Sequence, residues 1–321
     1  MASAMKRLTL AMVPWICVAT LFIGEPARAQ SGLHAVDLRL LAVADRLQKA
    51  NAPLCDRLAP SLGVSLQSKD QFSAGTDPGF AAPVAFAVVL PGGTASRAGI
   101  SENDGLVSVA GAPIVKLDDL QGMPLRDSAY AMLASTAAKD ATRLQLGVQT
   151  GDSVRQVVVE APPECRALVE IVAGERSIAR SDGRVIQIGE ALARKASDSE
   201  LAVIFAHELA HSVLRHRDRL SSLDVDKGLG GEFGRDRQLN GEAEIEADRM
   251  SVHLLANAGY DPAIAAAFWR GAVGREVSGG LFRSRIYSSA EGRAQMLERE
   301  IADYLSAGAP SWPGHLLARR P

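Results

Sequence analysis

The hydrophobic residues of the first half of the chain follow two different periods. From Ala35 to Ala50, apolar side chains recur every three or four residues, as on one face of an amphipathic helix, and Asn51-Ala52-Pro53 ends this pattern. Beyond Ser61, short runs rich in β-branched residues are separated by glycine and proline turns. They predict strands at Ala85–Leu90, Gly105–Val109, Leu144–Val148 and Val154–Val159, and a helix at Asp127–Ala138. We therefore expect a small β-dominated unit over residues 61–160.

The pattern changes again after Cys165. A strand is expected at Arg184–Ile188, directly after the turn Ser181-Asp182-Gly183, and helical periods dominate from Asp198 to the end. The glycine-rich and charged stretch Asp224–Asn240 predicts a mobile loop. Together the two halves predict an α+β protein.

The first thirty residues have the three parts of a secretory signal peptide. Lys6-Arg7 precedes an apolar run over residues 8–23, and the small-residue pattern Ala27-Arg28-Ala29 follows it. We expect cleavage after Ala29 and export to the periplasm or the cell exterior. An uncleaved membrane anchor is the alternative, but the apolar run is short for a membrane span. The mature chain is expected to have no transmembrane segment.

The charge and the cysteine content of the chain exclude several classes of protein. The chain has 35 Lys and Arg residues against 37 Asp and Glu residues, a net charge of -2, so no strong field attracts nucleic acid or anionic lipid. The 3 cysteines are too few for a disulfide-dense scaffold, and no CxxC pair is present for a zinc ribbon. After export, Cys55 and Cys165 would be the remaining thiols in a compartment where disulfides persist, and we expect them to pair. Two buried free thiols are the alternative.

The segment His207-Glu208-Leu209-Ala210-His211 lies in a stretch without proline or glycine, from Glu200 to Arg217, and is expected on a helix. Helix positions four apart are separated by about 40° of rotation, so both histidines face one side and can bind one zinc ion. Glu208 lies about 100° from His207 and can take a proton from a water at the metal. This HExxH spacing is typical of zinc peptidases.

A catalytic zinc site needs a third protein ligand, and the candidate is Glu244. Glu244 and Asp248 are spaced four apart on another expected helix, so both carboxylates share one face. One can complete a site for one zinc ion per chain, while the other accepts the second N–H of a ligating histidine. Glu242 and Glu246 lie on other faces of this helix. The alternative is an acidic helix face exposed to solvent.

The other histidines are expected to stay outside the metal site. His216 falls in a basic segment and is expected to be exposed, and His253 lies nine positions from Glu244, on the opposite side of the helix. His34 and His315 lie near the ends of the mature chain, and His315 is a distant alternative ligand.

The β-dominated unit resembles a bacterial PDZ domain. Ala85–Ile100 contains a strand, a Pro-Gly-Gly turn and an Ala-Gly-Ile step, and Asp104–Gly111 continues with a strand and a glycine turn. Asn103 and Ala110 depart from the Gly and Asn that are usual at their turn positions.

The PDZ resemblance implies a groove in which a peptide adds as a strand to an exposed sheet edge. The loop of Leu62, Gly63 and Val64 would hold the C-terminal carboxylate of that peptide. The alternative is a PDZ-shaped spacer whose groove is filled by its own chain, because a fold alone does not establish binding.

The metal motif and its surroundings resemble family 48 of the metallopeptidases. The resemblance rests on His207-Glu208-x-x-His211, on Glu244-x-x-x-Asp248 and on the segment Leu254–Pro262, and it covers roughly residues 165–305. The family includes the prenyl-protein endopeptidases, the membrane protease HtpX and soluble periplasmic quality-control proteases. It implies a mainly α-helical, zincin-like (gluzincin) domain with a small sheet, and zinc bound by His207, His211 and Glu244.

The same resemblance assigns roles to other positions. Glu208 would be the general base, and Asp248 would orient a ligating histidine. The strand of Val185, Ile186, Gln187 and Ile188 would be the edge that holds an extended substrate. Family members often carry His-Pro where this chain has Arg285–Arg293 without either residue, and Tyr287 is a candidate oxyanion donor there.

These expectations give five segments: a signal peptide (1–29), an N-terminal helix and connection (30–60), a PDZ-like domain (61–160), a zinc metallopeptidase domain (161–308) and a C-terminal tail (309–321). They predict an exported zinc metalloendopeptidase that cleaves unfolded or mislocalised envelope proteins. One alternative is a peptide-binding, chaperone-like protein with a latent or structural zinc site. A second is a zinc hydrolase that does not act on peptides.

Overall fold

The computed structural model describes residues 25–137, 142–225, 234–278, 289–305 and 310–321, and its mixed helices and sheets confirm the α+β class. Residues 1–24 of the expected signal peptide lie outside the described residues. The helices are α1 (Glu25–Ala50), α2 (Thr94–Arg97), α3 (Leu125–Ser135), α4 (Glu190–Lys195), α5 (Asp198–Val213), α6 (His216–Ser222), α7 (Gly234–Asn257), α8 (Ala263–Arg270), α9 (Ala272–Ser278), α10 (Ala290–Tyr304) and α11 (Gly314–Leu317). The strands are β1 (Leu58–Pro60), β2 (Val64–Ser68), β3 (Val84–Val89), β4 (Gly105–Val109), β5 (Ala112–Pro113), β6 (Thr142–Thr150), β7 (Ser153–Ala161), β8 (Pro163–Cys165), β9 (Leu168–Val172), β10 (Ala179–Ser181) and β11 (Val185–Gly189).

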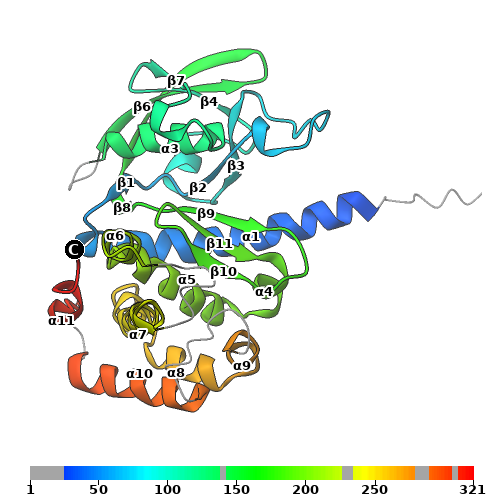
Figure 1. Cartoon of the computed structure of the whole chain (residues 1–321). Helices are drawn as coiled ribbons and strands as arrows, with labels where there is room; N and C mark the ends of the chain where they lie inside the picture. Colours follow the sequence, from blue (N-terminus) through cyan, green and yellow to red (C-terminus); the bar gives the residue numbers. More distant parts are fainter. Residues whose placement is uncertain (1–24, 138–141, 226–233, 279–288, 306–309) are drawn as a thin grey trace, which may run out of the picture.

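Residues 62–161 form the β-rich unit, at the top of Figure 1. Its antiparallel sheet has the strand order β2-β3-β4-β6-β7, with β5 paired to β4. The four expected strands are present as β3, β4, β6 and β7, and α3 covers the expected helix up to Ser135. Phe86, Leu106 and Leu146 are buried in a hydrophobic cluster between this sheet and α3.

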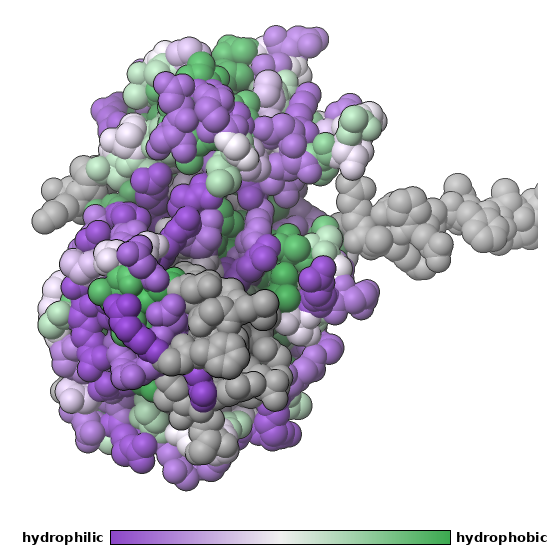
Figure 2. Space-filling view, viewed as in Figure 1, coloured by the Kyte–Doolittle hydropathy of each residue, from purple (hydrophilic) through white to green (hydrophobic). Residues whose placement is uncertain are grey.

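The remaining elements share a second hydrophobic cluster and form the helical unit, at the bottom of Figure 1. Helix α1 belongs to this core, because Leu40 and Leu47 are buried against it, and α1 passes between the two units (Figure 1). Leu316 of α11 is fully buried in the same cluster. Among the residues coloured in Figure 2, most on this face are hydrophilic, with smaller hydrophobic patches between them. Among the described helices, none combines the length and apolar character needed to cross a bilayer.

The sheet of the helical unit corrects one expectation. Its strand order is β10-β11-β9, with β11 antiparallel to β10 and parallel to β9. The prediction that Val185–Ile188 is an edge strand is therefore wrong, because β11 is the central strand. Ile186 and Ile188 are fully buried, as expected of a strand covered on its core face. The outer strand next to α5 is β10.

A disulfide joins Cys55 to Cys165, with 5.5 Å between their Cα atoms, and confirms the predicted pairing. Cys55 follows α1 closely, and Cys165 ends β8, which pairs with β1. The bond therefore fixes the end of α1 to the two strands that lie at the junction of the units.

The groove between β2 and α3 corresponds to the peptide groove implied by the PDZ resemblance. Leu62, Gly63 and Val64 line it, but α1 and the β8–β9 segment of the same chain line it as well. The Ser65 hydroxyl donates to the carbonyl of Val169 at 3.5 Å. The cavity that remains is about 30 Å³, which holds one or two waters but no peptide strand. The structure thus favours the alternative in which the chain itself fills this groove.

The expectation of a mobile loop over residues 224–240 is wrong for residues 234–240. Residues 234–240 form the first two turns of α7, and residues 226–233 lie outside the described residues. Glycine and charge density suggested a loop, but Arg235 to Asn240 contains no glycine or proline, so nothing in it prevents a helix.

Candidate metal centre

Helix α5 positions the two histidines of the HExxH segment. It begins with a capping box, in which the Ser197 hydroxyl accepts from the Glu200 backbone N–H and the Glu200 carboxylate accepts from the Ser197 N–H. The helix continues without interruption to Val213, so His207 and His211 lie one turn apart on one face. The confirmed helix therefore presents both imidazoles to α7, which packs against it.

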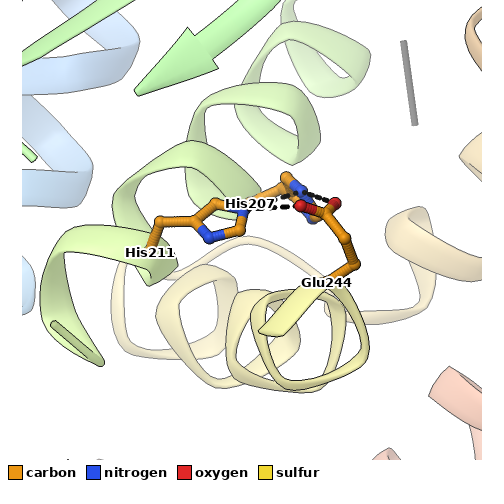
Figure 3. A group of neighbouring side chains, drawn as sticks. All are labelled: His207, His211 and Glu244. Atoms are coloured by element: carbon orange, nitrogen blue, oxygen red, sulfur yellow. Dashed lines mark hydrogen bonds and ion pairs between the residues drawn. The ribbon is translucent and has the colours of Figure 1, made fainter. Parts of the chain in front are cut away.

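Figure 3 shows the carboxylate of Glu244, from α7, directed at the two imidazoles from α5. The Nε2 atoms of His207 and His211 are 3.3 Å apart. Glu244 Oε2 is 3.3 Å from His207 Nε2, and Glu244 Oε1 is 3.6 Å from His211 Nε2. These three side chains form a group that could hold a metal ion, and they are the three that the sequence indicated.

Behind His207 lies a buried ion pair. Asp248 Oδ1 accepts from His207 Nδ1 at 2.9 Å, which leaves Nε2 facing the cluster. Arg293 of α10 donates to both oxygens of Asp248, at 2.7 and 2.6 Å. The guanidinium carbon of Arg293 lies 3.5 Å from the centre of the Trp269 ring. Asp248 thus has the expected orienting position, and Arg293 is a supporting residue that sequence reasoning missed.

Behind His211 lies a chain of hydrogen bonds through His216, which we call the His216 relay. It corrects the expectation that His216 is exposed. His216 is 2% exposed, and its Nδ1 lies 2.8 Å from His211 Nδ1. Its Nε2 lies 3.2 Å from Glu246 Oε2. Glu246 in turn accepts from Arg219 and from Arg319, both at 2.8 Å. Both histidines of the cluster are therefore held by hydrogen-bonded partners that fix their ring orientation.

The pKa values of the three carboxyl groups at this centre are shifted in different directions. Burial raises the pKa of Glu208 to about 7, although the charge of His207 opposes this. Burial would also raise the pKa of Asp248, but the charge of Arg293 and the hydrogen bond from His207 hold it below its ordinary value. The charges of His211 and His207 likewise lower the pKa of Glu244 against the effect of burial. Glu244 and Asp248 are thus anions, while Glu208 can exchange a proton near neutral pH.

Other candidates fall outside this cluster. Glu242 accepts from Gln238 on the same helix, and Tyr287 lies outside the described residues. His253 and His315 form a separate group with Glu300, whose Oε1 is 3.0 Å from His253 Nε2 and 2.8 Å from His315 Nε2.

Arg249 donates to the other oxygen of Glu300 at 2.6 Å. The guanidinium of Arg249 already balances the charge of the Glu300 carboxylate. Hydrogen bonds to Glu300 therefore explain why His253 and His315 lie close to it. This second group attaches α11, which carries His315, to α7 and α10.

No protein-family model matches the chain, and no curated protein sequence matches it significantly. Any assignment of function therefore depends on the chemistry of these residues.

Proposed function

We propose that the protein is an exported, zinc-dependent endopeptidase that hydrolyses peptide bonds of unfolded polypeptides. The observation that carries the proposal is the convergence of His207, His211 and Glu244 beside the buried carboxylate Glu208. Two imidazoles and one glutamate are a recurrent ligand set of catalytic zinc, with one position left open.

The spacing of the three donors supports zinc. Zinc–nitrogen and zinc–oxygen bonds of about 2.0–2.1 Å in a tetrahedral arrangement place neighbouring ligand atoms about 3.4 Å apart. The two Nε2 atoms are 3.3 Å apart, and each lies 3.3–3.6 Å from a different oxygen of the Glu244 carboxylate. The supporting hydrogen bonds to Asp248 and His216 fix which nitrogen of each histidine faces this point.

A bound zinc ion would supply Lewis-acid chemistry, polarising a carbonyl group and making water more acidic. Glu208 takes the proton of the attacking water and returns it to the leaving amine. An extended substrate pairs with the outer edge of β10, which packs against α5.

The disulfide Cys55–Cys165 supports export, since such bonds persist in oxidising compartments. The signal-peptide pattern of residues 1–29 supports export as well. Together with the resemblance to family 48 of the metallopeptidases, it supports unfolded proteins of the cell envelope as the substrates.

The test uses protein purified after export, so that the cell processes its N-terminus. We expect the zinc-loaded protein to cleave casein, an unfolded substrate, and the chelated protein to be inactive. Glu208→Gln should bind zinc but lose about 10²- to 10⁴-fold in rate. Glu244→Ala should lower zinc content, whereas Glu242→Gln, on the same helix, should not.

Residual casein cleavage by Glu208→Gln near the wild-type rate would remove Glu208 as the base. Zinc binding without cleavage by any form would instead support a latent or structural site. Cleavage of small esters without cleavage of casein would support a hydrolase of another class.

A further inference from the structure

A pocket of about 240 Å³ opens beside the metal centre. The side chains of His211 and Ser212, at the end of α5, form part of its wall. The disulfide Cys55–Cys165 and the turn between β10 and β11 form further parts. The volume is below the range of about 300–1,000 Å³ that is usual for small-molecule sites, so it suits one or two amino-acid side chains.

Charged residues dominate the lining of this pocket. Asp56, Asp182 and Asp218 contribute three negative charges. The five positive charges come from Arg57, Arg166, Arg184, Arg215 and Arg217. The lining therefore has an excess of positive charge, although the whole chain has a net charge of -2.

Two of the aspartates are each shared between two arginines. Asp218 Oδ2 accepts from Arg57 at 2.7 Å and from Arg215 at 3.0 Å. Arg215 also lies 4.0 Å from Asp56, which pairs with Arg320 at 3.0 Å. Three arginines thus share two carboxylates, so a positive charge remains at this side of the pocket.

Asp182 likewise accepts from Arg184 at 3.0 Å and lies 3.6 Å from Arg217, and Arg184 also pairs with Asp127 at 3.0 Å. Among the described residues, no carboxylate lies within ion-pair distance of the fifth arginine, Arg166. The pocket can thus accept a further anion without displacing an existing pair.

The disulfide fixes two of these arginines in place. Arg57 lies two residues after Cys55, and Arg166 directly follows Cys165. The backbone N–H of Arg166 donates to the carbonyl of Arg57 at 3.0 Å. The backbone positions of both arginines are therefore set before any ligand binds, which lowers the entropic cost of binding.

The pocket lies at the end of β10, the strand along which a peptide is proposed to bind. Strand β10 ends at Ser181, whose hydroxyl is 3.4 Å from that of Ser212, the residue after His211. Asp182, the next residue, lines the pocket. A strand added along the outer edge of β10 would therefore reach the pocket close to the metal-facing histidines.

We propose that this pocket is a subsite for a carboxylate of the substrate, next to the scissile bond. This inference rests on the proposed peptidase function and adds a preference for acidic substrates. The carboxylate belongs either to an Asp or Glu side chain or to the C-terminus of the peptide, and guanidinium groups bind both in the same planar geometry.

The test measures binding rather than cleavage, so it is independent of hydrolysis. Fluorescein-labelled decapeptides of Ala, Ser and Leu carry one Glu or one Gln at each position in turn, with a free or an amidated C-terminus. Fluorescence anisotropy gives their Kd for the zinc-loaded Glu208→Gln variant. We expect about tenfold tighter binding of a carboxylate at one position than of its amide, and a smaller preference at high salt.

In the same Glu208→Gln background, Arg166→Gln and Arg217→Gln should each reduce this preference. Arg143→Gln, which removes the same charge from the exposed surface of β6, should leave it unchanged. Melting temperatures confirm that each variant is folded.

A preference that survives amidation identifies a side-chain carboxylate, and one that amidation abolishes identifies the C-terminus. Equal binding of all four peptide types, or no binding of any, would overturn the subsite. A binding preference in a protein whose wild type cleaves nothing would keep the subsite and reject the peptidase function.

Discussion

The Nδ1 atoms of His211 and His216 lie 2.8 Å apart, and this contact determines which nitrogen of His211 can bind a metal. His216 Nε2 lies 3.2 Å from Glu246 Oε2, and a carboxylate anion can only accept. His216 therefore carries its proton on Nε2, and its Nδ1 accepts from the Nδ1–H of His211. Nε2 of His211 faces His207 and Glu244, and it carries no proton when it binds a metal.

The first prediction concerns this relay. His216→Ala should weaken zinc binding about 10- to 100-fold, because His211 loses the partner that fixes its tautomer and ring orientation. A competition titration against a colorimetric zinc chelator measures the Kd. His34→Ala, a partly exposed histidine on α1, is the matched control and should not change it. An unchanged Kd in His216→Ala would show that the relay does not support the metal.

The position of His216 behind His211 could not be predicted from the sequence, for a local physical reason. The apolar period and the absence of Gly and Pro predicted a helix that continues to Arg217, and the basic segment around His216 suggested that this residue is exposed. The helix instead ends at Val213, and Arg215 adopts a left-handed conformation with φ of 54°. This turn directs His216 back beneath His211. A non-glycine residue in this conformation is uncommon, so the pattern gave no sign of it.

The features that could be predicted depend on local spacing. His207 and His211 face one side because they are one helical turn apart, and Glu244 and Asp248 share a face for the same reason. The position of β11 could not be predicted in this way. Its apolar run was visible, but the hydrophobic pattern does not specify which strands pair with it, and β11 pairs with both β9 and β10.

A second prediction concerns the ion pair between Arg293 and Asp248. Arg293→Met should lower the free energy of unfolding of the zinc-free protein by about 3–5 kcal/mol, because it leaves the buried Asp248 carboxylate without its cation. Urea denaturation measures this loss. Arg270→Met, which removes an exposed arginine from pairs with Glu291 and Glu298, should change stability little. Equal losses in both variants would contradict a special contribution from Arg293.

A third prediction concerns the disulfide. Replacement of both Cys55 and Cys165 by serine should lower the free energy of unfolding by about 4–5 kcal/mol in the chain-entropy model, because the bond closes a loop with a sequence separation of 110. Reduction of the wild type with dithiothreitol should give a similar loss. A loss below about 1 kcal/mol in both experiments would show that the bond constrains the unfolded chain far less than this model requires.

The last prediction concerns pH and the carboxyl group of Glu164, which lines the small cavity between β2 and α3. Burial raises the pKa of Glu164 to about 8, and the charge of Asp45 adds to this effect, while Ser61 and Lys49 oppose it. The unfolded chain releases this proton near pH 4.5, but the folded chain retains it up to about pH 8. Between these values the folded state binds more protons, so the contribution of Glu164 to stability falls as pH rises.

Glu164→Gln should remove this contribution. The variant is expected to match the wild type near pH 5 and to be more stable at pH 8, with the difference growing by at most about 1.4 kcal/mol per pH unit. Urea denaturation of both proteins at pH 5, 6.5 and 8 isolates this carboxyl group, because all other groups titrate in both. Glu160→Gln, which alters an exposed carboxylate on β7, should give no such trend. A difference that is the same at all three pH values would mean that the Glu164 carboxyl is ionised in the folded protein at pH 5, with the neighbouring Lys49 outweighing the effect of burial.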